Sequence, residues 1–149
     1  MHRFKYKNQR QIGISIGFLY GNELKNAPCY ETTDVIVPVP LHPKKQKIRG
    51  YNQSEMFADG LAKAMNIPVN TRILMRSFFS ETQTRKSRFA RWENVKAIFD
   101  VENEELAGKH ILLVDDVITT GATIEACVNS LKKIPGAKIS VAAIAFASS

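Results

Sequence analysis

Apolar residues along the chain form short β-branched runs, and these alternate with longer segments in which apolar positions recur at helical spacing. The short runs predict strands, in chain order over residues 34–40, 69–75, 97–101, 111–114 and 139–146. The longer segments predict helices over residues 52–65 and 124–134. With right-handed crossovers, this order predicts a single parallel α/β sheet that has helices on both faces and binds ligands at the carboxyl ends of its strands.

Other segments fit the alternation less well. Residues 11–24 alternate like a strand but also fit one side of a helix, and we favour the helix. Their glycines, Gly13, Gly17 and Gly21, have the spacing of a membrane-helix dimer motif, but no apolar span surrounds them, so we expect the match to be accidental. Residues 41–50 are predicted to be loop. The polar stretch 77–93 lacks periodicity, and a loop of this length is more often an active-site lid than a connector.

Residues 111–123 are the most informative part of the chain. Residues 111–114 are apolar without alternation, as in a strand buried on both faces of a parallel sheet. Asp115 and Asp116 follow, and then a loop of small and hydroxylated residues, 119–123, leads into the predicted helix. Unpaired backbone amides and the positive end of the dipole favour an anion at a helix N-terminus. We therefore expect a phosphate-binding loop here.

Several interpretations of this stretch compete. A Walker B strand also ends in acidic residues, but the chain has no G-x-x-x-x-G-K-[ST] motif, which argues against a nucleotide triphosphatase. An isolated Asp-Asp pair is more often a turn that caps a helix. The combination of apolar strand, paired aspartates and Thr-Thr-Gly-Ala-Thr, however, resembles the fingerprint of the type I phosphoribosyltransferases, which bind 5-phosphoribosyl-1-pyrophosphate (PRPP).

That resemblance implies the type I phosphoribosyltransferase fold, with its Rossmann-like sheet. It implies that Asp115 and Asp116 accept hydrogen bonds from the ribose hydroxyls. It also implies that the 5-phosphate is held by Thr119, Thr120, Gly121, Ala122 and Thr123. Carboxylates would repel a phosphate but are good acceptors for a ribose diol, which agrees with this division.

The net charge is +7, and nine of the 21 lysines and arginines lie in two short regions. The regions are Lys44, Lys45, Lys47 and Arg49, and Arg76, Arg85, Lys86, Arg88 and Arg91. They indicate a polyanionic partner, but charge alone does not choose between a phosphorylated small molecule and nucleic acid. The first region follows a predicted strand and suits pyrophosphate, although a solvated basic turn explains it equally well.

The string Arg49-Gly50-Tyr51-Asn52-Gln53, preceded by Pro-Val-Pro-Leu-His, resembles the signature of the ComF-type phosphoribosyltransferase-like proteins, which are associated with competence and DNA uptake. The resemblance extends to Gln83, Arg91, Asn94 and Phe99. It implies that the pyrophosphate is bound by Pro40, Leu41, His42, Lys44 and Lys45. It implies that the leaving group is stabilised by Arg49, Arg85, Lys86 and Arg88, the last three through loop closure.

The activity so implied is transfer of phosphoribose from PRPP to an unidentified nitrogen nucleophile, an amine or a base. Mg²⁺ would be the cofactor, held mainly by substrate and water, with Asp115 and Asp116 as further candidate ligands. Type I enzymes choose the nucleophile with a hood, which leads us to expect a hood segment over residues 1–33 and a phosphoribosyltransferase domain over residues 34–149. We expect a homodimer, as is frequent in proteins of this resemblance.

Cysteine and histidine add little to this interpretation. Family members commonly carry an N-terminal zinc-ribbon-like segment, which these residues lack, and Cys29 and Cys127 form no ligand pair, so no zinc is expected. Cys127 is expected in the core. His42 and His110 are interpreted as a loop residue and a strand-edge residue rather than a base. There is no signal-peptide pattern or membrane-length apolar stretch, and we expect a cytoplasmic protein without membrane contact.

A different class of function competes with the enzyme. A non-catalytic or regulatory protein on the same fold could bind single-stranded DNA, with its basic residues on phosphates and its aromatic residues stacking on bases. The aromatic candidates are Tyr51, Phe78, Phe79, Phe89 and Trp92. The paired aspartates argue against a phosphate backbone nearby. A third hypothesis is a docking subunit of a larger assembly.

Overall fold

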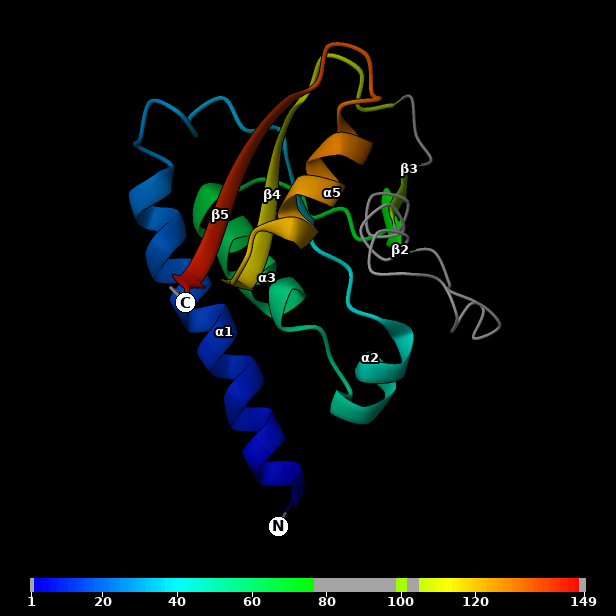
Figure 1. Ribbon diagram of the computed structural model, residues 1–149. Helices are drawn as coiled ribbons and strands as arrows, with labels where there is room; N and C mark the ends of the chain where they lie inside the picture. The colour runs from blue at the N-terminus through cyan, green and yellow to red at the C-terminus, as the bar shows by residue number, and fades with distance from the viewer. Residues whose placement is uncertain (1, 77–98, 102–104, 148–149) are drawn as a thin grey trace, which may run out of the picture.

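The centre of the molecule is a parallel sheet of three strands, seen in a computed structural model that describes residues 2–76, 99–101 and 105–147. The strands are β1 (Val35–Pro38), β4 (His110–Ile118) and β5 (Lys138–Phe146), and β4 lies between the other two (Figure 1). Val37 pairs with Leu113, and Leu113 pairs with Val141. The middle strand is the buried apolar run that the sequence predicts.

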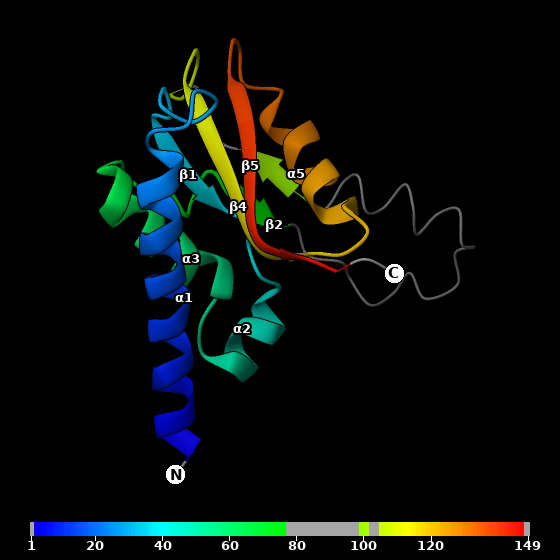
Figure 2. The same cartoon turned by 90° about the vertical axis from the view of Figure 1, so that its left-hand side faces the viewer.

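Helices cover both faces of this sheet, as Figure 2 shows. On one face, α1 (His2–Leu24) and α3 (Gln53–Met65) cover alternate β4 residues, and Leu112 packs with Phe57. On the other face lies α5 (Ala122–Leu131), where Leu113 packs with Cys127. The α/β class and the core position of Cys127 are therefore confirmed.

Two predicted strands lie outside the parallel sheet. β2 (Leu74–Arg76) and β3 (Phe99–Val101) pair antiparallel in a small sheet of their own. Only a single bridge, from Val69 to Ile36, joins the predicted strand 69–75 to β1. The side-chain oxygen of Asn70 then accepts hydrogen bonds from the backbone of residues 72 and 73, at 2.9 and 3.0 Å. This Asx turn redirects the chain, so the expectation of one continuous strand is wrong.

The favoured helix over residues 11–24 is confirmed, and its glycine spacing has a use. A Cβ on Gly17 would lie 3.0 Å from the Cα of Gly60, and one on Gly21 would lie 2.7 Å from the Cβ of Ala64. Only the match to a membrane-helix motif was expected to be accidental; the spacing itself has a role that the sequence analysis did not predict, because the glycines let α1 approach α3 closely within one chain. Since the contacting positions rise together, the two helices run in the same direction. The N-terminal half of α1 consequently projects past the carboxyl ends of β4 and β5 (Figures 1 and 2).

The prediction of a loop over residues 41–50 is also wrong, since α2 (Pro43–Arg49) forms there. His42 caps it, because its Nδ1 accepts a hydrogen bond from the backbone of Lys44 at 3.2 Å. Pro43 occupies the first turn, where a missing N–H costs nothing. Gly50 ends the helix with a φ of 80°. No residue of α2 is buried, so the helix depends on these caps rather than on a core face.

His110 begins β4 at the amino edge of the sheet, as the sequence predicts. Its ring forms hydrogen bonds with Thr32 Oγ1 and Ser140 Oγ, both at 2.8 Å, and its backbone donates to Asp34 at 2.8 Å. Burial is the main cause that lowers the pKa of His110, and Lys138 acts in the same direction. This histidine joins the segment before β1 to β4 and β5.

Among the helices of the described residues, none combines the length and the apolar composition that a membrane span requires.

Candidate functional site

The two aspartates line different hollows near the carboxyl end of β4, although their carboxyl groups interact with each other. The sequence places them after the strand, but β4 continues to Ile118 and includes them. Asp115 lines a hollow together with residues 117–124 at the start of α5, whereas Asp116 lines a cavity beside α1. The pair therefore stands between two concave surfaces at the carboxyl edge of the sheet.

Two hydrogen bonds orient the carboxylate of Asp115, and both of them reach the same oxygen. The hydroxyl of Ser54 and the backbone N–H of Asp116 both donate to Asp115 Oδ1, each at 2.9 Å. Burial raises the pKa of Asp115 to about 6, while these two hydrogen bonds act in the opposite direction. Among the described residues, no donor reaches Asp115 Oδ2. That oxygen is available to accept a hydrogen bond from a ligand.

The hollow beside Asp115 has the features of an anion site. Gly121 is the N-cap of α5 with a φ of 79°, a conformation that favours glycine, and no side chain caps the helix. Thr120 Oγ1 accepts only a long hydrogen bond, of 3.4 Å, from the backbone of Ala122. Nothing lies within 4 Å of where a Cβ on Gly121 would stand. Residues 119–123, predicted to bind phosphate, thus come together around the amino end of α5.

The segment that starts α3 ties this site to β1. Asn52 is 2% exposed. Its Oδ1 caps α3 by accepting from the backbone of Ser54 at 3.1 Å, and its Nδ2 donates to the Val39 carbonyl at 3.0 Å. Val39 in turn donates to the backbone of Val114 at 2.8 Å. The predicted pyrophosphate segment, which begins at Pro40, therefore leaves the sheet beside the carboxyl end of β4. The sequence analysis places the start of this helix at Asn52 but does not predict the role of Ser54.

The predicted cations are only partly described. Lys45 lies exposed on α2 together with Lys44, and Arg49 at the end of α2 donates to the side-chain oxygen of Gln53. These cations are held at the surface rather than packed against the aspartates. Several predicted residues lie outside the described residues: Arg85, Lys86, Arg88, Gln83, Arg91, Asn94 and the rest of the expected lid 77–93. Phe99, by contrast, is buried in the core.

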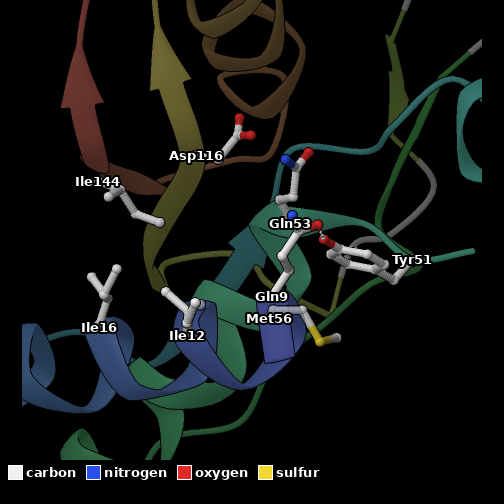
Figure 3. A pocket seen from close by; sticks show the side chains of 9 residues that line it. Gln9, Ile12, Ile16, Tyr51, Gln53, Met56, Asp116 and Ile144 are labelled. Carbon is white, nitrogen blue, oxygen red and sulfur yellow. Dashed lines mark hydrogen bonds between the residues drawn. The ribbon is translucent and has the colours of Figure 1, made fainter. Parts of the chain in front are cut away.

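A cavity of about 250 Å³ lies on the Asp116 side, and the sequence does not predict it. Figure 3 shows isoleucines on one side of it and Tyr51, Gln9 and Gln53 on the other. It is lined by Gln9, Ile12, Gly13, Ile16, Tyr51, Gln53, Met56, Asp116 and Ile144. These residues come from α1, α3, β4, β5 and the segment before α3. The clue to this cavity in the sequence is that two of its lining residues, Tyr51 and Gln53, belong to the ComF-type signature.

A family model for the phosphoribosyl transferase domain matches residues 51–149, which include α3, the aspartates and the loop 119–123. The chain belongs to the phosphoribosyl transferase domain family. Among solved structures, it is similar to the glutamine PRPP amidotransferase of Bacillus subtilis, with a TM-score of 0.59 and 23% identity. That alignment covers 88% of this chain and 26% of the other, and it supports the fold alone.

Curated relatives confirm the resemblance to ComF-type members of this family. Competence protein F of Haemophilus influenzae is 32% identical over 95% of this chain and 64% of its own length. DNA utilization protein YhgH of Escherichia coli is 29% identical over 83% of this chain and 56% of its own length. The chain thus spans about three fifths of the length of these two relatives.

The donor set at this site suits Mg²⁺. Asp115 and Asp116 offer carboxylate oxygens, the ligand type that Mg²⁺ prefers, and this ion usually takes one or two carboxylates together with water and substrate phosphates. Val117 donates its backbone N–H to Asp116 Oδ1 at 2.8 Å, which leaves Oδ2 of Asp116 for a ligand. In the described parts of the chain, no three His, Cys, Asp or Glu side chains gather as a metal site.

Proposed function

We propose that this protein binds PRPP with Mg²⁺ and transfers the phosphoribosyl group to a nitrogen nucleophile. One observation carries the proposal: the paired aspartates of β4 stand between a helix N-terminus without a side-chain cap, which suits an anion, and a separate cavity. A ribose over the end of β4 would have its 5-phosphate on one side and its reactive C1 on the other. A sugar phosphate fits this arrangement because each part of it meets a complementary group.

The residues of the site have distinct roles in this reaction. The amides and hydroxyls of residues 119–123 hold the 5-phosphate, and the free oxygens of Asp115 and Asp116 accept from the ribose hydroxyls. The nitrogen forms a bond to C1 while the C1–O bond breaks and its electron pair leaves with pyrophosphate. The negative charge of Asp116 stabilises the positive charge that develops on the ribose. Mg²⁺, when bound, neutralises charge on the pyrophosphate.

The pyrophosphate lies, in this proposal, beside the segment that follows β1. Pro40, Leu41 and His42 lead from the end of β1 to α2, whose cations Lys44 and Lys45 face solvent at the same edge of the sheet. Arg49 assists from the end of α2. Arg85, Lys86 and Arg88 remain candidates for stabilising the leaving group through loop closure. The division into a hood over residues 1–33 and a phosphoribosyltransferase domain over residues 34–149 also remains a prediction. A cytoplasmic homodimer stays a prediction.

The alternative is a protein that binds single-stranded DNA on the same fold. The exposed lysines of α2 favour it, and so do the relatives, which are called a competence protein and a DNA utilization protein. In either case we propose a role linked to competence. The two functions make opposite demands on the aspartates, because carboxylates accept from ribose hydroxyls but repel a phosphate backbone.

Calorimetric titration with PRPP, with and without Mg²⁺, tests the proposal. We expect Mg²⁺-dependent binding to the wild-type chain and loss of binding in the double variant Asp115→Asn with Asp116→Asn. The matched control is Glu23→Gln with Glu31→Gln, which removes two exposed negative charges located before β1, away from the site. Absence of PRPP binding in the wild-type protein, with single-stranded DNA bound equally by wild type and the aspartate variant, would support the alternative.

A further inference from the structure

The short helix α2 carries cations but has no apolar face that holds it against the core. None of its residues is buried, and its isoleucine, Ile48, is 83% exposed. A helix of this length is marginal by itself, because helix formation needs either more turns or tertiary packing. The position of the α2 cations relative to the sheet is therefore set by the residues that flank the helix.

The C-terminal flank of α2 is held by the N-terminal half of α1. Gly50 ends α2, and its carbonyl accepts a hydrogen bond from the guanidinium of Arg10 at 2.5 Å. The same guanidinium lies 4.9 Å from the centre of the Tyr51 ring, within reach of a cation–π contact. A positive charge also suits the C-terminal end of a helix, where the dipole is negative. Arg10 thus contacts two consecutive residues between α2 and α3.

Tyr51 gives Arg10 a fixed surface to lie on. Its side chain is 8% exposed, and its hydroxyl donates to the side-chain oxygen of Gln9 at 3.3 Å (Figure 3). The next residue, Asn52, donates to the Val39 carbonyl at 3.0 Å and so joins the same segment to the end of β1. Two neighbouring residues of α1 therefore hold Tyr51, one by its hydroxyl and the other by its ring.

The position of Arg10 follows from the packing of α1 on α3. Arg10 precedes Gly13 and Gly17 on one face of α1, at spacings of three and four residues. A Cβ on Gly13 would lie 3.0 Å from the Cβ of Met56, and one on Gly17 would lie 3.0 Å from the Cα of Gly60. Because the two helices run in the same direction, the position one turn before Gly13 meets the residues that precede α3. A long side chain is needed there, since α3 has not yet begun.

Arg10 contacts the protein rather than the candidate site. It is not among the residues that line the hollow beside Asp115 or the cavity beside Asp116. Its effect on a ligand would therefore pass through α2, whose last residue, Arg49, directly precedes Gly50. The cations whose position depends on this contact are Lys44, Lys45 and Arg49.

We propose that Arg10 is a positioning residue: by holding Gly50 and Tyr51, it keeps α2 where its cations meet the pyrophosphate of PRPP. The inference rests on the proposed function, in which the pyrophosphate lies beside α2. Without Arg10, α2 occupies this position for a smaller fraction of the time, and the apparent affinity for a pyrophosphate group falls by that fraction. Residues 119–123 lie at the other end of the substrate and do not depend on this contact.

Three ligands separate this role from a general effect on the protein. PRPP has both phosphate ends, ribose 5-phosphate lacks the pyrophosphate, and inorganic pyrophosphate lacks the sugar. In calorimetric titrations with Mg²⁺, Arg10→Ala should weaken the binding of pyrophosphate and of PRPP about tenfold and leave that of ribose 5-phosphate unchanged. PRPP keeps its contacts with residues 119–123, so its binding is weakened rather than lost. Unchanged affinity for ribose 5-phosphate also shows that the variant is folded.

Two further variants serve as controls. Arg10→Lys keeps the charge but not the planar group that donates to the Gly50 carbonyl while it lies on the Tyr51 ring, so it should recover part of the lost affinity. Lys25→Ala removes one exposed positive charge just after the other end of α1 and should change none of the three affinities. Hydrogen exchange of the α2 amides should be faster in Arg10→Ala and unchanged in Lys25→Ala.

The results that would overturn the inference are specific. Pyrophosphate bound equally by wild type and Arg10→Ala would do so, and so would equal weakening of all three ligands, which indicates a general structural role. Weakened pyrophosphate binding without faster exchange in α2 would mean that Arg10 binds the anion itself. If wild type binds PRPP but not free pyrophosphate, the ratio of the PRPP affinity to the ribose 5-phosphate affinity decides in the same way.

The two proposals fail in different ways. PRPP that binds wild type and Arg10→Ala equally would refute the role of Arg10 and leave the proposed function standing. Pyrophosphate that binds and depends on Arg10, in a protein without affinity for PRPP, would refute the transferase and leave the positioning of α2. A wild-type protein that binds neither PRPP nor pyrophosphate would refute both.

Discussion

Replacing Gly17 by alanine should destabilise the protein, although alanine is the better helix former. Gly17 faces α3, and an added Cβ would overlap the Phe57 carbonyl oxygen and lie 3.0 Å from both the Gly60 Cα and the Leu61 backbone nitrogen. All three atoms are backbone, so no flexible side chain can move aside. The two helices would have to separate.

The magnitude follows from two opposing effects. Overpacking in a well-packed interior typically costs about 1–3 kcal/mol, and more when only backbone can yield. Exchange of glycine for alanine inside a helix gains roughly 1 kcal/mol. Because only backbone atoms meet the added Cβ, the upper part of the overpacking range, about 2–3 kcal/mol, applies, and the net expectation for Gly17→Ala is a loss of about 1–2 kcal/mol. For a domain of this size that loss corresponds to a decrease in Tm of about 2–8 °C.

Thermal and urea unfolding, followed by circular dichroism, measure this effect. The control is Ser15→Ala on the same helix, where the side chain is exposed and only helix propensity changes. It should be neutral or stabilising by a few tenths of a kcal/mol, about the propensity difference between serine and alanine. If Gly17→Ala were as stable as Ser15→Ala, the close contact between α1 and α3 would not exist in solution and the argument from glycine spacing would be refuted.

Other predictions concern the site and its support. Ser54→Ala removes the donor to Asp115 and should weaken PRPP binding about tenfold in calorimetry, whereas Ser54→Thr, which keeps the hydroxyl, should retain most of it. Asn52→Ala loses both the helix cap and the bond to Val39 and should cost about 1–3 kcal/mol of unfolding free energy in urea titrations; an unchanged midpoint would contradict this. Because burial lowers the pKa of His110, the unfolded chain takes up a proton below about pH 6.5 that the folded chain resists. Stability should therefore fall as the pH decreases from about 6.5, with no contribution from this group above it, and His110→Asn should flatten that slope.

The sequence predicts the elements that are defined by local pattern. The middle strand is an apolar run because both of its faces are covered by helices, and this state leaves a direct signal in the sequence. The helix from Gln53 begins at a capping asparagine and ends at Asn66 in the left-handed conformation, again a local signal. The short helix Pro43–Arg49 also has local signals, a proline in its first turn and a glycine after its end. The sequence analysis interpreted this segment as a basic loop and therefore missed the helix.

The sequence does not predict features that arise from tertiary contacts. Asp115 and Asp116 are predicted to follow the strand, and that each of them lines a different hollow depends on how β4 continues past them. The cavity brings α1 together with β5, whose residues are more than a hundred positions apart, and no periodicity reports such a contact. The antiparallel pairing of β2 with β3 likewise depends on an Asx turn at Asn70 rather than on strand propensity.

The direction of α1 links these observations to the chemistry. If α1 ran antiparallel to α3, its N-terminal half would lie at the amino edge of the sheet, away from Asp116. Because the glycines at positions 13, 17 and 21 meet positions 56, 60 and 64 in the same order, residues 9–16 instead arrive at the carboxyl edge and form a wall of the cavity. A substitution that separates the two helices, such as Gly17→Ala, should then move Ile12 and Ile16 relative to Ile144 and change the shape of the cavity, which a crystal structure of the variant would show. Residues 119–123 do not touch this interface in the described structure, so PRPP binding through the phosphate should persist. A displaced wall of the cavity with PRPP binding retained is thus the result expected if helix packing positions the N-terminal half of α1, and loss of PRPP binding in Gly17→Ala would contradict this argument.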